Sequence, residues 1–114
     1  MFKRNDPARQ RALRGVILRL AHLAAASEAS NPDDPYSISR TVLVQTLEAT
    51  DGLPASDELR GALRYLEAKQ YVQVRWLRDG TGEFVSFRLE AAGIDLVEGT
   101  TRDPGVGFQR RRDY

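Results

Sequence analysis

The sequence predicts an α+β fold that is mainly α, because a helical pattern changes abruptly into a strand pattern in its second half. Over residues 56–69, leucines recur with the four-and-three spacing of an amphipathic helix. Over residues 71–89, apolar and polar residues alternate, as they do in half-buried strands. Asp79-Gly80 and Gly82 interrupt the alternation and tolerate the positive φ of a tight turn. These observations predict one helix that leads directly into a β-hairpin.

The helix expected over 56–69 has its own start and stop signals. Ser56 is placed to cap it, and the carboxylates of Asp57 and Glu58 suit the positive end of the helix dipole. Lys69 suits the last turn, and Gln70 stands where a glycine often ends a helix. The expected buried stripe consists of Leu59, Ala62, Leu63 and Leu66.

The alternation in the hairpin assigns one face of each strand to the core. The expected inward residues are Val72, Val74 and Trp76 on the first strand and Val85, Phe87 and Leu89 on the second. Leu77 and Phe84 are then expected on the exposed face.

Two further helices and a short strand are expected upstream. Pro7 can begin a helix over about 7–27, with Asp6 as its cap. A short strand is expected at Tyr36-Ser37-Ile38. A second helix over about 39–50 would be capped by Ser39 or Ser37. Its expected inward residues are Val42, Leu43, Thr46 and Leu47.

The first helix has two faces of different character. The face expected to meet the core carries Leu13, Val16, Ile17, Leu20, Leu23 and Ala24. The other face carries Leu18 and several small residues, so it is less polar than an ordinary solvent-facing surface. Two interpretations stay open: this face packs on a second copy of the chain as a homodimer, or the helix is simply rich in alanine.

The expected domain organisation has three parts. Residues 1–6 form a basic N-terminal arm, residues 7–99 form the domain, and residues 100–114 form a flexible basic tail. Residues 90–99 are expected to form a short C-terminal helix, whereas the following residues contain Pro104 and show no period. Three helices, a β-hairpin wing and a short C-terminal helix together predict a winged helix-turn-helix.

Charge is distributed unevenly along the 114 residues. The net charge is +1, but residues 1–19 carry +5, residues 20–99 carry −6 and residues 100–114 carry +2. There is no cysteine, which excludes disulfides and thiolate metal sites. No apolar run approaches the ~18 residues of a membrane span, so no membrane role is expected. A cytoplasmic location follows as the expectation.

No constellation of catalytic residues stands out, so we expect that the protein is not an enzyme and uses no cofactor. His22 is the single histidine, and it has no second metal-type ligand near it in the sequence. Asp33 and Asp34 lie in a loop without the further spaced oxygens of a calcium site. The DGTG sequence falls in a hairpin and not between a strand and a helix, which a phosphate-binding loop requires.

Two segments resemble a family of small uncharacterised proteins of Mu-like prophages. They are LRGALRYLEAKQYVQV, from Leu59, and AAGIDLVEGTTRDPGV, from Ala91. The first segment is also similar to many winged-helix regulators, although Gln70-Tyr71 replaces the Gly-Leu that is common there. The resemblance implies a winged helix and a phage or prophage origin in a bacterial host. It implies no mechanism and no site.

Two functions are compatible with these features. In the first, the protein binds DNA through helix 56–69, the 71–89 hairpin and the basic arms, and regulates transcription. The residues expected to contact DNA are Arg60, Arg64, Arg75, Arg78, Arg88, Arg110, Arg111 and Arg112. In the alternative, the chain is a protein-interaction module of a phage assembly or packaging complex with no DNA readout, which the acidic middle of the chain favours.

Overall fold

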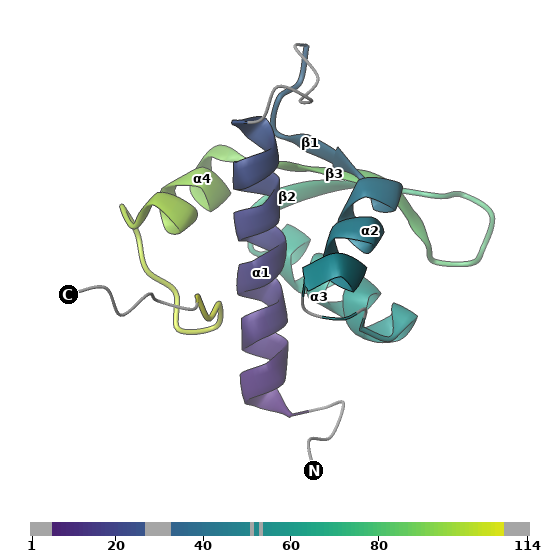
Figure 1. Cartoon of the computed structure of the whole chain (residues 1–114), viewed down its shortest axis with the longest axis horizontal. Coiled ribbons are helices and arrows are strands. Elements are labelled where there is room, and N and C mark those ends of the chain that lie inside the picture. Colours follow the sequence, from purple (N-terminus) through teal and green to yellow (C-terminus); the bar gives the residue numbers. More distant parts are fainter. Residues whose placement is uncertain (1–5, 27–32, 51, 53, 109–114) are drawn as a thin grey trace.

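A computed structural model describes residues 6–26, 33–50, 52 and 54–108. Within these residues the fold is α+β, with four helices and one three-stranded antiparallel sheet (Figure 1). The helices are α1 (Pro7–Ala25), α2 (Arg40–Thr50), α3 (Ser56–Ala68) and α4 (Ala91–Glu98). The strands are β1 (Ser37–Ser39), β2 (Val72–Trp76) and β3 (Phe84–Leu89), in the order β1-β3-β2. This arrangement is compatible with a winged-helix-like fold.

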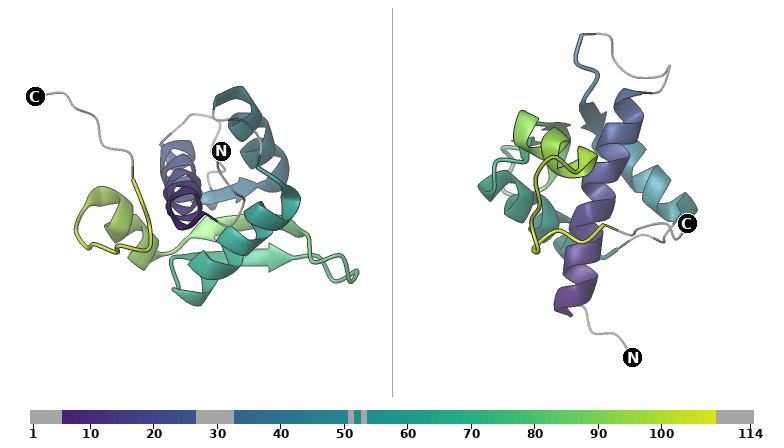
Figure 2. Two further views of the ribbon diagram at one scale, coloured as in Figure 1. Left: turned by 90° about the horizontal axis from the view of Figure 1, so that it is seen from below. Right: turned by 90° about the vertical axis from the view of Figure 1, so that its left-hand side faces the viewer.

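The core lies where α1 crosses the sheet. Figure 2 (left) shows α1 end-on, with α4 on one side of it and α2 on the other. The largest fully buried side chains of the core come from four elements, α1, α2, α3 and β3. They are Ile17, Leu18, Leu43, Leu47, Leu63, Leu66, Phe84, Phe87 and Leu89. The stripe predicted for α3 is confirmed, since Leu59, Ala62, Leu63 and Leu66 are all buried.

Helix α1 begins as predicted, and most of its predicted face packs against the core, but two of its leucines are placed differently. The side chain of Asp6 accepts a hydrogen bond from the Ala8 amide at 3.0 Å. Leu18, expected on the outer face, is completely buried, whereas Leu23, expected in the core, is 58% exposed. The reason is that α1 is covered from two sides, by the sheet and α3 and by α4 with the residues that follow it. Leu18 is therefore not available for contact with a second copy.

Residues 100–108, expected within a flexible tail, instead follow α4 and reach α1 through residues 105–107 (Figure 2, right). The Gly107 amide donates to the Arg11 carbonyl at 2.9 Å, and Val106 is buried. Gly15 makes this approach possible, because a Cβ there would collide with the Gly107 carbonyl. We call residues 100–108 the C-terminal strap. The rest of the predicted tail, 109–114, lies outside the described residues, as do residues 1–5 of the predicted arm.

Helix α3 begins and ends differently from a simple capped helix. Ala55, and not Ser56, holds the cap position, and the Glu58 carboxylate accepts from the Ala55 amide at 3.2 Å. At the other end, Gln70 adopts the left-handed conformation with φ 65°. The Tyr71 amide then donates to the Leu66 carbonyl at 3.0 Å, as in a Schellman motif. Gln70 therefore takes the glycine position that the sequence indicated.

The hairpin contains a β-bulge that reverses part of the predicted alternation. Arg75 pairs with Ser86 and Trp76 pairs with Phe84, so Val85 has no partner in the register. One extra residue shifts every side chain before it to the opposite face. Phe84 is consequently 1% exposed and Val85 is 37% exposed, the reverse of the prediction, while Phe87 and Leu89 are buried as expected.

The start of α2 confirms one prediction and corrects another. Ser39 Oγ accepts a hydrogen bond from the Val42 amide at 3.2 Å, so Ser39 caps the helix as expected. Leu43 and Leu47 are buried, but Val42 is exposed. The strand β1 pairs with β3, which places the beginning of α2 beside the hairpin.

Candidate nucleic-acid interface

Three arginines gather where the beginning of α2, the middle of α3 and the hairpin meet. Arg60 Nη1 lies 3.1 Å from Glu83 Oε2, and Arg40 Nε lies 3.6 Å from Glu83 Oε1. One carboxylate therefore holds two guanidinium groups from different helices. Arg64, one turn after Arg60 on α3, completes the group.

Arg64 is positioned by an aromatic ring of the hairpin. Its guanidinium carbon lies 4.4 Å from the centroid of the Trp76 ring, within the range of a cation–π contact. Trp76 is itself fixed, because its indole N–H donates to Glu67 Oε1 at 3.1 Å. Glu67 Oε2 also accepts the Val74 amide at 3.2 Å. Glu67 thus joins α3 to β2, and Arg64 stays near the hairpin without a carboxylate partner in the described part of the chain.

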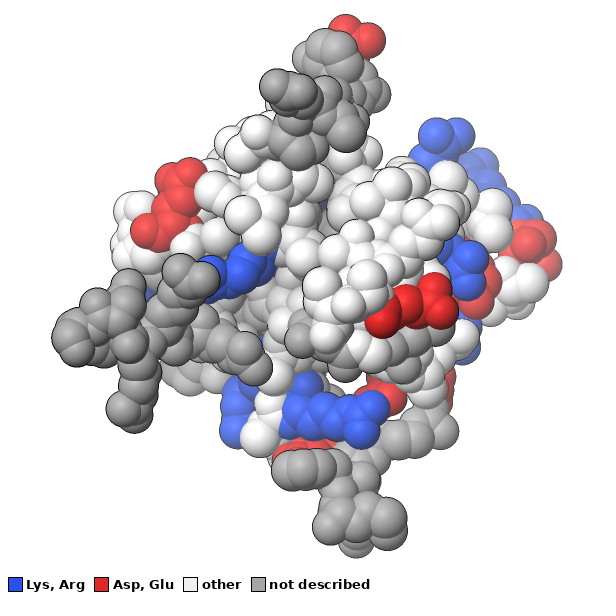
Figure 3. Space-filling view, in the orientation of Figure 1, with Lys and Arg blue, Asp and Glu red and all other residues white. Residues whose placement is uncertain are grey.

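The hairpin adds two exposed arginines, Arg75 and Arg78. They border a shallow hollow together with Leu77 and Val85, which are 44% and 37% exposed. In Figure 3, basic side chains lie over the hairpin and at the lower end of α1, with acidic side chains between them. We call Arg40, Arg60, Arg64, Arg75 and Arg78 the hairpin arginines.

Arg88 is not brought into this group. It lies near the end of β3, ~13 Å along the strand from Phe84 at the hairpin side. Its guanidinium is 3.7 Å from a carboxylate oxygen of Asp34 and 3.7 Å from one of Glu90. Two carboxylates therefore lie within ion-pair distance of Arg88, and it lies apart from the other arginines. Arg110, Arg111 and Arg112 lie outside the described residues.

Sequence reasoning missed Arg40 and the role of Glu83. Arg40 is the first residue of α2, and the pairing of Ser39 with Ser86 brings it to the hairpin. The short strand predicted before α2 could have indicated Arg40. A strand that pairs with the hairpin places the residue that follows it beside the hairpin. Glu83 gave no such signal, because its partners lie on two different helices.

The arginines of α1 have mixed surroundings. Arg9 Nη2 lies 3.0 Å from Glu58 Oε1, so it neutralises a carboxylate in the first turn of α3. Arg14 stacks over the Tyr65 ring, with 3.6 Å between the guanidinium carbon and the ring centroid, and donates to the Gly105 carbonyl at 3.0 Å. The buried Nε of Arg14 has no hydrogen-bond partner. Arg9 can therefore assist α3 electrostatically, whereas Arg14 is part of the packing.

The described residues show neither a membrane helix nor a metal centre. None of their helices is long and apolar enough to cross a bilayer. No three of their His, Asp or Glu side chains converge in a way that could hold a metal ion. His22, within this part of the chain, pairs with Glu98, with 3.0 Å between Nε2 and Oε2.

These features define an α+β domain with a basic group between a helix and a β-hairpin. No protein-family model matches the chain. No curated protein matches it either. Among solved structures, the chain is similar to the circadian clock associated protein Pex from Anabaena, with a TM-score of 0.45 and 16% identity. The alignment covers 76% of this chain and 75% of that one. The resemblance to the prophage family therefore stays a prediction.

Proposed function

We propose that the chain is a winged-helix DNA-binding protein with α3 as its recognition helix and the β2–β3 hairpin as its wing. The observation that carries the proposal is the grouping of Arg40, Arg60 and Arg64 between two helices and the hairpin. In helix-turn-helix proteins the second helix enters the major groove of DNA and the first crosses the backbone. Guanidinium groups in these positions hydrogen-bond guanine or hold phosphates.

The proposed division of roles follows from the position of each residue. Arg60 and Arg64 lie on α3 and would face base edges or phosphates in the groove. Arg40, at the beginning of α2, and Arg75 and Arg78, on the hairpin, would contact the sugar–phosphate backbone. Arg88 is not part of the proposed interface, because it lies near the end of β3 that is remote from the hairpin turn. Arg9 reduces the repulsion that Glu58 would exert on phosphates.

The test is a fluorescence-anisotropy titration of a mixed-sequence duplex at two salt concentrations. It compares the wild-type chain with the double variant Arg60→Ala/Arg64→Ala. We expect micromolar, salt-dependent binding by the wild type, and binding weaker by about tenfold to a hundredfold in the variant. The slope of log affinity against log salt should fall by about one for each lost phosphate contact. Circular dichroism establishes that both proteins are folded.

The matched control is Arg88→Gln, which removes an arginine from the same sheet but outside the proposed interface. Its affinity for the duplex should equal that of the wild type. If the folded wild type shows no salt-dependent binding at micromolar concentration, the DNA proposal fails. If the double variant binds like the wild type, α3 is not the recognition helix.

A second candidate is a protein-interaction module without DNA readout, for example in a phage assembly or packaging complex. The observation that favours it is the pair of exposed apolar side chains, Leu77 and Val85, beside the hollow on the hairpin. Exposed apolar groups among arginines suit a protein surface that is partly apolar and partly acidic. A folded wild type that fails to bind DNA would favour this candidate over the first.

A further inference from the structure

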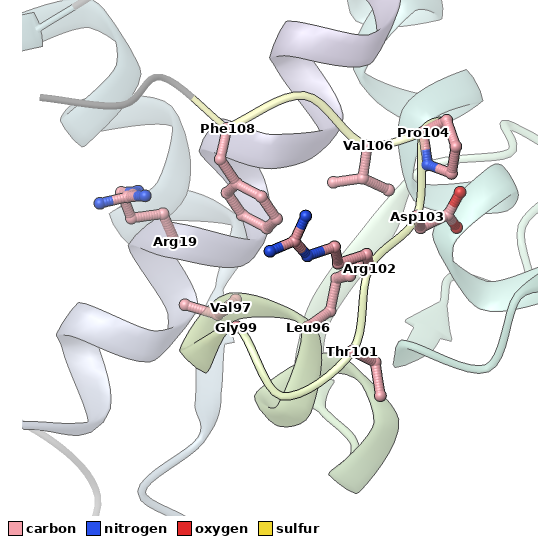
Figure 4. A pocket seen from close by; sticks show the side chains of 10 residues that line it. All are labelled: Arg19, Leu96, Val97, Gly99, Thr101, Arg102, Asp103, Pro104, Val106 and Phe108. Carbon is pink, nitrogen blue, oxygen red and sulfur yellow. The ribbon is translucent and has the colours of Figure 1, made fainter.

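A separate hollow of about 490 Å³ lies on the other side of α1, between that helix, α4 and the C-terminal strap (Figure 4). Leu96 and Val97 of α4 form one apolar wall, and Val106 and Phe108 of the strap form another. Arg19 of α1 and Arg102 of the strap supply positive charge. The volume lies within the range of sites that hold small molecules.

Arg102 has the position expected of a ligand-binding arginine. In Figure 4 its guanidinium group extends into the hollow toward the Phe108 ring. Arg19 lies beyond that ring, with its guanidinium carbon 5.6 Å from the ring centroid. Neither arginine has a carboxylate within ion-pair distance among the residues that the structure describes.

The neighbouring carboxylate cannot readily compensate Arg102. Asp103 also borders the hollow, but its oxygens accept from the Tyr71 hydroxyl at 2.5 Å and from the Gly105 amide at 2.8 Å. Lys69 Nζ lies 3.6 Å from the same carboxylate. Asp103 is thus occupied by other donors, and the charge of Arg102 remains directed at the hollow.

The walls of the hollow are fastened to α1. His22 of α1 pairs with Glu98 at the end of α4. The strap is held by the bond from the Gly107 amide to the Arg11 carbonyl and by the bond from Arg14 to the Gly105 carbonyl. A ligand would therefore meet a preformed site, which lowers the entropy cost of binding.

We propose that this hollow binds a small organic anion, namely a carboxylate on a planar apolar body. The carboxylate would pair with the forked N–H groups of Arg102, and Arg19 would add a second positive charge. The apolar body would lie against Val97, Val106 and Phe108. This site is distinct from the hairpin arginines and does not depend on the DNA proposal.

The experiment uses 2-naphthoate as the anion and 2-naphthamide as a neutral molecule of the same shape. Each is titrated into the ¹⁵N-labelled full chain, and amide shifts are followed by NMR. We expect saturable shifts for the amides of Gly99, Thr101 and Phe108 with the carboxylate, and binding at least about tenfold weaker with the amide. Arg102→Gln should weaken naphthoate binding by about tenfold, and Arg19→Gln by less.

Arg11→Gln is the matched control, because Arg11 is an exposed arginine of α1 whose side chain does not border the hollow. It should bind naphthoate like the wild type. Equal binding of naphthoate and naphthamide would overturn the proposal, since the hollow would then recognise only apolar shape. The absence of saturable shifts up to millimolar naphthoate, or equal losses in Arg11→Gln and Arg102→Gln, would overturn it as well.

Discussion

At the scale of single residues, Tyr71 and Asp103 fasten the strap to the hairpin. The Tyr71 hydroxyl donates to Asp103 Oδ2 at 2.5 Å, and this bond is the main reason that the pKa of Asp103 lies below its usual value. Burial, together with the bond to Asp103, raises the pKa of Tyr71 to about 12. The pair therefore favours a protonated phenol and an ionised carboxylate.

Tyr71→Phe should lower the free energy of unfolding by about 2 kcal/mol at pH 7, the usual contribution of a hydrogen bond to a charged group. The folded pKa of Asp103 is depressed, so its contribution is present above the unfolded value of about 3.9 and disappears as the pH falls through the folded value. The folded pKa of Tyr71 is raised, so its contribution is present below about 10 and is lost as the pH rises through about 12.

Urea unfolding at pH 7 and in acid measures the difference in the free energy of unfolding between the wild type and Tyr71→Phe. It should shrink in acid, once Asp103 is protonated in the folded state. Tyr36→Phe is the control, because no described group hydrogen-bonds the Tyr36 hydroxyl, and it should leave the stability nearly unchanged. A difference that grows in acid would contradict the assignment of the bond to an ionised Asp103.

Capping residues read from the sequence predicted some helix ends correctly and one incorrectly. Asp6, Ser39 and Gln70 act at the positions that the sequence indicated. Ser56 does not cap α3, because Ala55 takes the cap position and Glu58 supplies the acceptor instead. Several adjacent polar residues can start one helix, and the choice among them depends on how the preceding turn enters it.

At the scale of elements, the contact between α1 and the strap depends on the missing side chain of Gly15. Gly15→Ala would place a methyl group against the Gly107 carbonyl, which is backbone and cannot rotate away. The substitution should lower stability, although alanine favours a helix over glycine by about 1 kcal/mol. Thermal unfolding followed by circular dichroism measures the change.

Gly61→Ala is the matched control on α3. A Cβ at Gly61 meets nothing within 4 Å, so only the helix propensity should change, and stability should rise by about 0.5–1 kcal/mol. The two substitutions are chemically identical but should change the stability in opposite directions. If Gly15→Ala also raises stability, the strap does not lie against α1 as described.

Periodicity predicted the elements better than it predicted their buried faces. The three main helices and both hairpin strands occur close to the expected positions. On α1 most of the predicted face packs against the core, but Leu18 is buried as well, because α4 and the strap cover a second side of the helix. The Phe84–Val85 reversal arose from a bulge, and one inserted residue leaves no trace in composition.

At the scale of the whole molecule, several basic and acidic side chains of the described residues meet in ion pairs. Glu83 is the acidic residue most directly opposed to the proposed DNA contacts, because it holds both Arg40 and Arg60. A phosphate entering this group would meet two guanidinium groups and one carboxylate. Glu83 thus positions the arginines and at the same time weakens their attraction for an anion.

Glu83→Gln should strengthen binding to duplex DNA by about threefold to tenfold at low salt, if the proposed interface is right. Glutamine keeps an oxygen that can accept from Arg60, so the arginine geometry should survive. The same anisotropy titration provides the measurement. Glu98→Gln removes an equal charge on α4, beside His22, and should have little effect; equal gains in both variants would point to net charge alone.

The candidate site was only partly predictable for reasons of geometry. Arg60 and Arg64 were found because helical spacing places them one turn apart on the face opposite the leucines. Arg40, Glu83 and the separation of Arg88 depend on strand register and on contacts between residues far apart in the sequence. The hollow beneath the strap also depends on contacts between residues far apart in the sequence, so no local sequence pattern predicts it.

The strap also bears on the order in which the chain can fold during translation. Helix α1 leaves the ribosome before the strap that covers Gly15, which is synthesised after the sheet and α4. At ~5–20 residues per second, the Gly15 face stays open to solvent for seconds before its cover exists. A nascent chain that lacks the strap would still present this uncovered side of α1, including the neighbourhood of Leu18, to chaperones and other chains. The packing of this side of α1 is therefore completed only after Val106 and Gly107 have emerged.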